Sequence, residues 1–338
     1  MATIKEVAAA AGVSISTVSR AFNNYSDING KTKERILEAA RSLDYSPNIS
    51  ARNLSSKKRL NLGLIISGFL NENANVDILF GHMKGAFRYA SENSLDLALY
   101  ITSNEEQKRL SYHSFCIEHS LAGAIISGLT TDDNYYQELS RGVPFPSVMM
   151  DIELPSGDAG IVTSDNRSAM KDMITFLLSE GHERIAIIAG KKSATVTEVR
   201  LDGVRDAYAE KGIPLSESDI YYADFSRQEA YEITKRLAGE NRKYSAYACF
   251  SDEMAFGVIR ALQEEGIKIP HECSVTGFDD VQLSGNITPA LTTVRQDFEK
   301  TGYEAASLLH RILEGRDDGK RVILKCPIIH RDSTKALK

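Results

Sequence analysis

The sequence predicts an all-α helix-turn-helix head followed by an α/β body that forms two lobes with parallel sheets. In the first 46 residues, apolar side chains recur at helical spacing in three short segments. After residue 60, apolar runs of strand length alternate with helical stretches, which is the pattern of parallel sheets covered by helices. The 338 residues, 42% hydrophobic and 25% charged, have a globular composition and are too many for one compact core.

The head is predicted to contain three helices. Thr3–Glu6 fits a capping box, in which the glutamate side chain reaches back to the first residue of the motif. Gly12 ends this helix, because glycine needs no Cβ at a left-handed position. Ser14 is a good N-cap for a second helix over Ile15–Asn23, and a third begins near Asn29. Two helices joined by a glycine-containing turn and braced by a third indicate a helix-turn-helix.

The second helix has a thin inward face, for which Val18, Ala21 and Phe22 are the candidates. Its outer face carries Ile15, Ser16, Ser19 and Arg20. A solvated helix face ordinarily carries Lys and Glu, whereas short hydroxyls, an aliphatic tip and one guanidinium can approach base edges and phosphates. The pattern therefore favours a helix that reads DNA over an ordinary solvated face.

The segment "YSPNISARNLSSKKR" follows the third helix. Pro47 breaks that helix. Asn48–Ser56 is too short to be a stable helix alone, because isolated helices below about 12 residues are marginal in water. The segment is either a disordered linker or a helix that forms only against a partner. Leu54 is an ordinary exposed leucine or, in a DNA-binding linker, a wedge between base steps.

Charge is distributed unevenly along the chain. Residues 1–59 hold ten Lys and Arg against five Asp and Glu, a net charge of +5, whereas the remainder holds 30 against 41, a net charge of −11. A basic head on an acidic body is typical of a nucleic-acid reader joined to another domain. We expect a cytoplasmic protein with free thiols and no membrane segment, because the four cysteines are scattered and neither a signal layout nor an apolar run of about 18 residues occurs.

The body contains about nine strand-and-helix units, too many for one open sheet. One of its predicted helices runs over Glu105–His119. Polar residues end many of the predicted strands: Ser67, Ser127, Asp151, Asp165, Ser251, Asp252, Asp279 and Asp280. Ligands of such sheets bind beyond the carboxyl ends of the strands, and two facing lobes would bring these ends to one cleft. Each residue alone is equally well explained as a loop cap, but together they suit a polyhydroxyl ligand such as a sugar.

Enzyme and cofactor motifs are absent from the sequence. No G-x-G-x-x-G follows a strand, and neither G-x-S-x-G nor H-E-x-x-H occurs. The run "NGKT" at 29–32 lacks both the earlier glycine and the preceding strand of a phosphate-binding loop. The seven histidines have no metal-ligand spacing and are explained as solvated or core residues. We expect no enzyme activity, no cofactor and no metal.

The runs "TIKEVAAAAGVSISTVSRAFN", "KTKERILEAARSLDYSPN" and "NISARNLS" resemble the head of LacI/GalR-family transcription regulators. The resemblance implies that Ile15, Ser16 and Arg20 occupy base-reading positions. It also implies that Asn48–Ser56 is a hinge helix whose Leu54 opens a minor-groove step. At the reading positions Ile15 and Ser16 this chain departs from the family pattern, so the operator sequence of a relative cannot be assigned to it. The expected DNA contacts are Thr3, Ser14, Ile15, Ser16, Thr17, Ser19, Arg20, Asn23, Asn48, Ala51, Arg52 and Leu54.

The body resembles the family's periplasmic-binding-protein-like core, through "EGHERIAIIAG", "FSDEMAFGVIRALQEEGIKIP", "SVTGFDD" and a closing "HRDST". By position, Arg200 would fork onto effector hydroxyls and Asp279 would accept hydrogen bonds from them. Asp151 would help from the other lobe, and Phe225 would stack on the apolar face of a sugar. The second-rank contacts are Ser127, Ser251 and Gln296.

Two departures from the family pattern concern the effector site. The segment "GFLNENANVD" at 68–77 lacks the usual short turn with its Asp and Asn-Pro, and Val196 stands where some relatives have a polar contact. The expected domains are a DNA-binding head (1–46), a hinge (47–59) and an effector-binding and dimerisation core (60–338). The first lobe takes about 60–162 plus 294–322, and the second about 163–293 plus 323–338.

Residues and resemblance together predict a homodimeric repressor that binds operator DNA and controls a sugar-utilisation operon. A small carbohydrate effector, a mono- or oligosaccharide, would relieve repression. A regulator whose ligand promotes DNA binding remains open. A solute-binding receptor shares the two-lobed core but would not need the basic head, and a sugar-modifying enzyme would need an acid–base pair or metal site that the sequence does not show.

Overall fold

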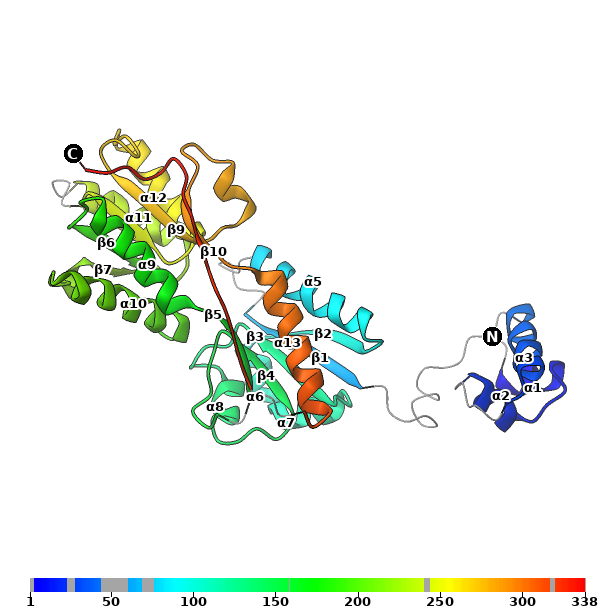
Figure 1. Ribbon diagram of the computed structural model, residues 1–338. Helices are drawn as coiled ribbons and strands as arrows, with labels where there is room; N and C mark the ends of the chain where they lie inside the picture. Colours follow the sequence, from blue (N-terminus) through cyan, green and yellow to red (C-terminus); the bar gives the residue numbers. More distant parts are fainter. Residues whose placement is uncertain are drawn as a thin grey trace. The chain divides into compact units, whose positions relative to one another are not determined.

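The computed structural model describes residues 3–22, 28–43, 60–68, 76–157, 159–239, 244–316 and 320–337. The chain divides into two compact units, Met1–Leu60 and Asn61–Lys338, hereafter the head and the body (Figure 1). Within the described ranges, no helix is both long enough and apolar enough to cross a membrane.

The described residues of the head form three helices: α1 (Ile4–Ala10), α2 (Ile15–Phe22) and α3 (Gly30–Ser42). The Glu6 carboxylate accepts hydrogen bonds from the Thr3 amide at 2.7 Å and the Thr3 hydroxyl at 2.9 Å, which fixes the start of α1. Gly12 adopts a φ of +60° after this helix. Ser14 Oγ accepts from the Thr17 amide at 3.1 Å and so caps α2.

The core of the head is small and consists of Val7, Ala8, Ala11, Val18, Ala21, Ile36 and Ala40. The alanines allow the three helices to approach one another closely, and the larger side chains fill the space between them. α2 contributes only Val18 and Ala21 as buried residues. Most of the surface of α2 therefore lies outside the core, as its thin apolar face predicts.

The body contains two six-stranded sheets. The first has the order β11-β5-β4-β3-β1-β2, and all its strands are parallel. Its strands are β1 (Asn61–Ser67), β2 (Asp96–Thr102), β3 (Gly123–Ser127), β4 (Ser147–Met150), β5 (Gly160–Ser164) and β11 (Arg321–Leu324). The second has the order β12-β10-β9-β8-β6-β7 and is parallel except for β12, which pairs antiparallel with β10. Its strands are β6 (Ile185–Ala189), β7 (Ile220–Tyr222), β8 (Ala246–Cys249), β9 (Ser274–Asp279), β10 (Thr292–Arg295) and β12 (Ile328–Ile329).

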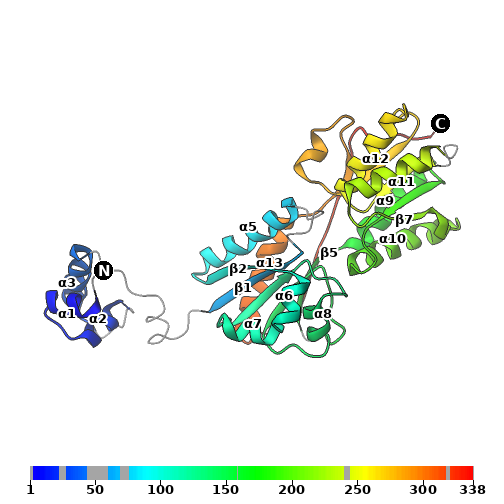
Figure 2. The same ribbon diagram turned by 180° about the vertical axis from the view of Figure 1, so that it is seen from behind.

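Helices cover both faces of the first sheet. They are α5 (Val76–Glu92), α6 (Asn104–Arg109), α7 (Tyr112–Glu118), α8 (Asn134–Leu139) and α13 (Phe298–Leu313). α7 and α8 pack on the face that carries Ile65, Ile126 and Met149 (Figure 2). α13 packs along β3, β4 and β5 on the other face, and α5 lies beside α13. This two-sided cover explains why the strands read as continuous apolar runs.

The second sheet is covered by two helix pairs, α9 with α10 and α11 with α12. The helices are α9 (Asn166–Ser179), α10 (Thr195–Lys211), α11 (Arg227–Gly239) and α12 (Asp252–Glu264), with two short 3₁₀ turns, η1 (Glu217–Asp219) and η2 (Gln282–Gly285). Glycines allow both pairs to pack closely, because a Cβ on Gly203 or Gly257 would come within 2.3 Å and 2.1 Å of a carbonyl oxygen of the neighbouring helix. The core of this lobe is one continuous apolar cluster that runs from α9 to β10.

One predicted helix of the body is wrong. The expected helix over Glu105–His119 is divided into α6 and α7, because Leu110 is extended between them. Ser111 follows and caps α7 by accepting a hydrogen bond from the Ser114 amide at 3.2 Å. A serine that can satisfy a helix amide favours a new helix start over helix continuation.

The chain passes between the two sheets three times, from β5 to α9, from β10 to α13 and from β11 to β12. The last passage is the long extended segment in red in Figure 1. The expected lobe limits at 293/294 and 322/323 divide β10 and β11, whereas each of these strands lies wholly in one sheet. The carboxyl ends of both parallel sheets meet near these passages.

Candidate functional site

The outer face of α2 carries the side chains predicted to read bases. Ile15 is 44% exposed, Ser16 and Arg20 are exposed, and Ser19 is half-buried. Less than three turns of helix thus present an aliphatic tip, hydroxyls and one guanidinium. These groups can contact a thymine methyl, either member of a base pair and a guanine, respectively.

Some of the predicted DNA contacts in the head also hold the helix ends. Ser14 Oγ lies 2.9 Å from Ser16 Oγ and 2.8 Å from Thr17 Oγ1. The Thr3 hydroxyl, in turn, is bound to Glu6. If these hydroxyls contact DNA, they do so while they also form hydrogen bonds within the head. Asn23, Asn48, Ala51, Arg52 and Leu54 lie outside the described residues.

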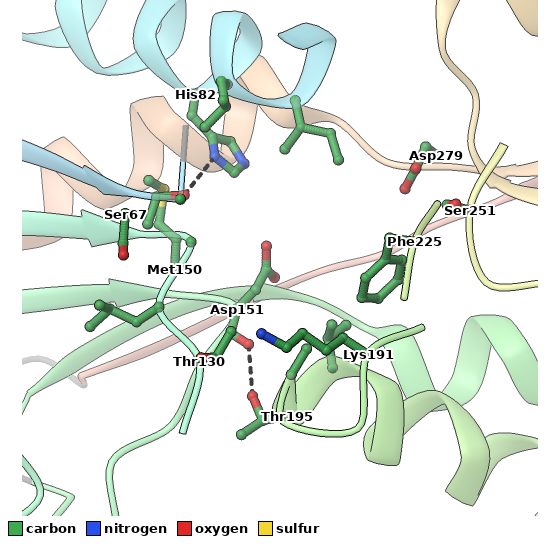
Figure 3. A pocket seen from close by; sticks show the side chains of 18 of the residues that line it. Ser67, His82, Thr130, Met150, Asp151, Lys191, Thr195, Phe225, Ser251 and Asp279 are labelled. Carbon is green, nitrogen blue, oxygen red and sulfur yellow. Dashed lines mark hydrogen bonds between the residues drawn. The ribbon is translucent and has the colours of Figure 1, made fainter. Parts of the chain in front are cut away.

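A cavity of about 320 Å³ lies in the body, where strands of both sheets end (Figure 3). All seven residues predicted to contact the effector line it: Ser127, Asp151, Arg200, Phe225, Ser251, Asp279 and Gln296. Ser127 and Asp151 stand at the ends of β3 and β4 in the first sheet, and Ser251 and Asp279 stand at the ends of β8 and β9 in the second. The volume is at the small end of the range for ligand pockets, about 300 to 1,000 Å³.

Arg200 is buried in the pocket wall and held in one orientation. Its Nε donates to Asn166 Oδ1 at 2.9 Å, and its Nη1 donates to the Phe250 carbonyl. The guanidinium carbon lies 3.7 Å from the centre of the Phe278 ring, a cation–π contact. These two hydrogen bonds use two of the five N–H donors, so a preorganised group with further donors lies at the pocket.

Asp279 is buried beside Arg200 at the end of β9. Gln296 Nε2 donates to its Oδ1 at 2.7 Å. Burial raises the pKa of the Asp279 carboxyl well above its ordinary value, and the nearby Arg200 charge acts in the opposite direction. A carboxylate that has lost its hydration binds strongly to a ligand hydroxyl that donates to it.

Asp151 connects the two lobes at the pocket. It has a φ of +59°, and its Oδ1 accepts from Thr163 Oγ1 at 2.9 Å. Its backbone carbonyl accepts from the hydroxyl of Thr195, the first residue of α10, at 3.3 Å. Nearby, the Thr131 amide donates to the Ser193 carbonyl at 3.0 Å. The first lobe thus contacts the start of α10 directly beside the cavity.

Phe225 is placed by its backbone and by a glycine. Its φ is +58°, a conformation that non-glycine residues rarely adopt. A Cβ on Gly190 would come within 2.0 Å of the Phe225 ring, so the ring lies directly on the glycine backbone. Figure 3 shows this ring at the wall of the pocket between Lys191 and Ser251.

Two of the second-rank residues already use their hydroxyls within the protein. Ser127 Oγ lies 3.3 Å from His82 Nδ1. Ser251 Oγ accepts from the Met254 amide at 3.2 Å and caps α12. Both hydroxyls line the cavity, but helix capping alone accounts for the serine at 251.

The sequence interpretation missed several residues that line the cavity, above all His82, Lys191 and Thr195. His82 lies in the middle of α5 rather than at a strand end, so strand-end reasoning could not find it. The sequence pattern that could have indicated His82 is a histidine on the apolar face of a predicted helix. Val196 lines the pocket as well, and of the atypical segment at 68–77 Gly68 does so, while residues 69–75 lie outside the described ranges.

Family models match both the head and the body of the chain. Residues 3–48 match the family model described as bacterial regulatory proteins, lacI family, and residues 174–334 match a periplasmic binding protein-like domain. The chain is 28% identical, over the whole length of both proteins, to the HTH-type transcriptional repressor PurR of Vibrio parahaemolyticus serotype O3:K6 (strain RIMD 2210633).

Two solved structures match nearly the whole chain. One is the Lac repressor dimer bound to operator and the anti-inducer ONPF, with a TM-score of 0.88, 25% identity and 99% of each chain covered. The other is the complex of the transcriptional regulator CelR with cellobiose, with a TM-score of 0.74, 26% identity, and 98% of this chain and 100% of that chain covered. The helix-turn-helix head, the two-lobed body and these relatives agree: the chain belongs to the LacI family of bacterial regulatory proteins and is a transcriptional repressor, not an enzyme.

Proposed function

We propose that this repressor controls a sugar-utilisation operon and that a small carbohydrate, bound in the cavity of the body, releases it from its operator. The observation that carries the proposal is the composition of the cavity. Carboxyl groups from both lobes, those of Asp151 and Asp279, line it together with a fixed guanidinium and an aromatic ring. Sugar hydroxyls both donate and accept hydrogen bonds, and the C–H face of a sugar packs on an aromatic ring, so a sugar satisfies every group of this set.

The cavity volume and one relative support a carbohydrate of modest size. A cavity of about 320 Å³ is suited to a small ligand. The CelR protein, which is 26% identical to this chain, was solved as a complex with cellobiose. A mono- or disaccharide is therefore the effector class that we propose.

On the DNA side, we propose a homodimer whose two heads dock in successive major grooves of a near-palindromic operator. An exposed apolar face of α5 favours a dimer. It carries Val76, Phe80 and Phe87 at helical spacing. An apolar stripe of this kind on a surface helix marks an interaction site. The hinge segment at 47–59 would fold between the two heads and the minor groove.

The proposed switch depends on ligand contacts with both lobes. Asp151 belongs to the first lobe, and Arg200 and Asp279 belong to the second, so a ligand that binds all three favours one relative position of the lobes. That position would separate the two hinge segments and remove the partner that each short helix requires. Coupling energies of this kind are about 1 to 3 kcal/mol and are reciprocal, so operator DNA should weaken effector binding by the same factor.

The proposal is tested by a thermal-shift panel of monosaccharides, disaccharides, nucleobases and nucleosides on the full chain. Each compound that stabilises the protein is then titrated into a complex with an operator selected from random DNA, followed by fluorescence anisotropy. We expect a neutral saccharide to raise the melting temperature and to lower operator affinity about 5- to 150-fold. A panel in which only nucleobases or nucleosides bind contradicts the sugar effector.

A second candidate is a regulator of the same family whose ligand promotes DNA binding. It is favoured by the Lac repressor dimer that was solved with operator and the anti-inducer ONPF bound together, because a ligand of that protein is compatible with operator binding. The pocket chemistry is the same for both candidates. The anisotropy titration separates them by its sign, since a ligand of this second kind would raise operator affinity.

A further inference from the structure

One polar atom in the pocket wall has no partner among the residues that the structure describes. His82 lies on α5, its side chain lines the cavity, and it is only 1% exposed. Its Nδ1 lies 3.3 Å from Ser127 Oγ, and its ring packs edge-on against Phe298 with ring centres 5.8 Å apart. Within the described part of the chain, its Nε2 has no hydrogen-bond partner. Among the described residues, it is the one buried, unpartnered side-chain atom that belongs to a pocket-lining residue.

Packing alone does not explain an imidazole at this position. A buried polar group without a hydrogen bond costs about 1 to 3 kcal/mol, so native proteins rarely leave one unpaired. α5 packs against α13 through glycine contacts: a Cβ on Gly85 would come within 1.8 Å of the Glu299 carbonyl oxygen, and one on Gly302 within 2.0 Å of the His82 carbonyl oxygen. The close approach of the two helices therefore depends on the backbone of His82, and an apolar side chain could pack against Phe298 without burying an unpaired polar atom.

The contact with Ser127 occupies Nδ1 and orients the ring, so Nε2 is available for a hydrogen bond with a ligand. The serine hydroxyl lies on the Nδ1 side of the ring, and Figure 3 shows the His82 ring at the part of the pocket wall that α5 forms. Burial lowers the pKa of His82, with the Asp151 charge acting in the opposite direction, so the ring is neutral and carries one donor and one acceptor. Since the serine hydroxyl can donate to Nδ1 or accept from it, Nε2 is the donor in one tautomer and the acceptor in the other.

We propose that Nε2 of His82 binds a hydroxyl group of the effector and that this contact sets effector specificity from the first lobe. A hydroxyl is the group that serves either tautomer, because it both donates and accepts. The inference rests on the proposed sugar effector and adds to it a recognition residue for one hydroxyl. Arg200, Asp279 and Phe225 then bind the ligand from the second lobe, and His82 with Asp151 binds it from the first.

The test uses the full chain and the saccharide from the panel that raises its melting temperature most. Three replacements separate the two ring nitrogens. His82→Gln places a polar atom near the position of Nε2, His82→Asn places one near Nδ1, and His82→Leu removes both. His182 supplies the matched control, because it is also buried but both of its ring nitrogens are bonded, to Ser245 Oγ at 3.1 Å and to the Lys335 carbonyl at 2.9 Å.

We expect His82→Leu and His82→Asn to weaken binding of that saccharide about tenfold in calorimetry, and His82→Gln to retain most of it. One monodeoxy analogue of the saccharide should bind equally to wild type and to His82→Leu, which identifies the hydroxyl in contact. His182→Leu should lower the melting temperature and leave saccharide affinity unchanged.

Two results would overturn the inference while the proposed function stands. One is unchanged saccharide affinity in both His82→Leu and His82→Asn, and the other is an equal loss in His82→Gln and His82→Leu. A chain that binds only nucleobases contradicts both the sugar effector and the hydroxyl contact, whereas a nucleoside that binds through His82 contradicts the sugar operon alone.

Discussion

At the scale of single residues, burial of the Arg200 guanidinium is unfavourable for folding, and the proposed contact with the effector gives a reason for it. Its guanidinium is buried, and burial lowers its pKa while Asp279 and Asp151 act in the opposite direction. A buried cation is costly unless it is paired, and two of the groups that bind it here are a neutral amide and a carbonyl. A stack on Phe278 and two hydrogen bonds keep the guanidinium rigid, which is what a fork for ligand hydroxyls requires.

The first prediction is that Arg200→Ala abolishes the response to effector and leaves operator binding intact. The substitution removes the fixed donors of the second lobe, so effector affinity should fall at least about tenfold. Operator affinity without effector should stay within about threefold, because the head is a separate unit. The measurement is an anisotropy titration of the operator complex with effector.

Arg167→Ala is the matched control for that titration. Arg167 lies on α9 and binds Asp206 of α10 through an exposed ion pair, so its loss removes a charge beside the same helix without touching the cavity. Its dose response should match that of wild type. An unaltered dose response in Arg200→Ala would place the effector elsewhere.

The second prediction concerns pH. Burial lowers the pKa of both His82 and His182 below the ordinary value of 6.5, so below that pH the unfolded chain binds protons that the folded chain excludes. The contribution to stability is therefore complete above pH 6.5 and is lost as pH falls toward the folded-state pKa. Between pH 7.5 and 5.5, the melting temperature of wild type should fall further than that of the double variant His82→Leu/His182→Leu. An equal fall in both proteins would mean that these rings are not protected from protonation.

The sequence could predict which residues line the cavity where they follow the end of a strand or match a family motif. Asp151, Ser251 and Asp279 end strands, and parallel strands must end at one edge, so these residues had to converge if the lobes faced each other. His82 could not be found in this way. Its place in the pocket depends on the packing of α5, which brings His82 to Ser127 at the end of β3, and not on a local sequence pattern.

At the scale of elements, the α5–α13 pair is the contact most sensitive to volume. A Cβ on Gly85 would come within 1.8 Å of the Glu299 carbonyl oxygen and within 2.6 Å of the Tyr303 amide nitrogen. Both atoms are backbone, so a whole helix must move to make room. The third prediction is that Gly85→Ala destabilises the body by about 1 to 3 kcal/mol, the usual cost of overpacking.

Differential scanning calorimetry measures this effect as a fall in the melting temperature of the body of about 2 to 4 °C per kcal/mol. Gly239→Ala is the control, because it ends α11 and a Cβ there meets nothing within 4 Å. We expect that variant to stay within about 0.5 kcal/mol of wild type. Equal melting temperatures for Gly85→Ala and Gly239→Ala would show that α5 and α13 are not in close backbone contact.

The fourth prediction assigns base reading to α2. Arg20→Ala should weaken binding to the selected operator by about 1 to 3 kcal/mol while nonspecific binding changes little, because a guanidinium paired with a guanine is lost. Arg35→Ala is the control, since it removes the same charge from an exposed position on α3, and it should alter specific and nonspecific binding alike. Competition assays with unrelated DNA separate specific from nonspecific binding. Equal behaviour of the two variants would contradict α2 as the reading helix.

Elements were predictable to the extent that local signals agreed. The start of α1 and the cap of α2 follow directly from Thr3, Glu6 and Ser14. The division of Glu105–His119 into two helices was missed, because Leu110 and Ser111 do not break helical periodicity, and the extended residue between α6 and α7 appears only in the fold. Propensity is a weak guide where a polar cap and an apolar spacing compete.

At the scale of the whole molecule, three chain passages join the two sheets of the body within the described residues, and the proposed switch would bend the chain there. Direct contacts beside the cavity, Thr195 to Asp151 and Thr131 to Ser193, would have to form or break as the lobes move. The sequence predicted two lobes from the count of strand-and-helix units. The passages through residues 296 and 325 could not be predicted from local pattern, because they depend on which sheet each late strand joins.

The last prediction concerns assembly. Val76, Phe80 and Phe87 lie within about 40° of one another around α5, and Phe80 is 63% exposed, so an apolar stripe faces away from the core. If two copies pair through it, the variant Phe80→Glu/Phe87→Glu should be monomeric in analytical ultracentrifugation, because four carboxylates would face one another across the interface. Operator affinity should then fall by about 10²- to 10⁴-fold, since two linked heads bind far more tightly than one. Effector binding should persist, because the cavity lies within one chain.

The control for this prediction is Ile117→Glu, which places a carboxylate at a similarly exposed apolar position on α7. This variant should remain dimeric, because α7 is not part of the proposed interface. If the Phe80→Glu/Phe87→Glu protein stayed dimeric, the interface would not be formed by α5.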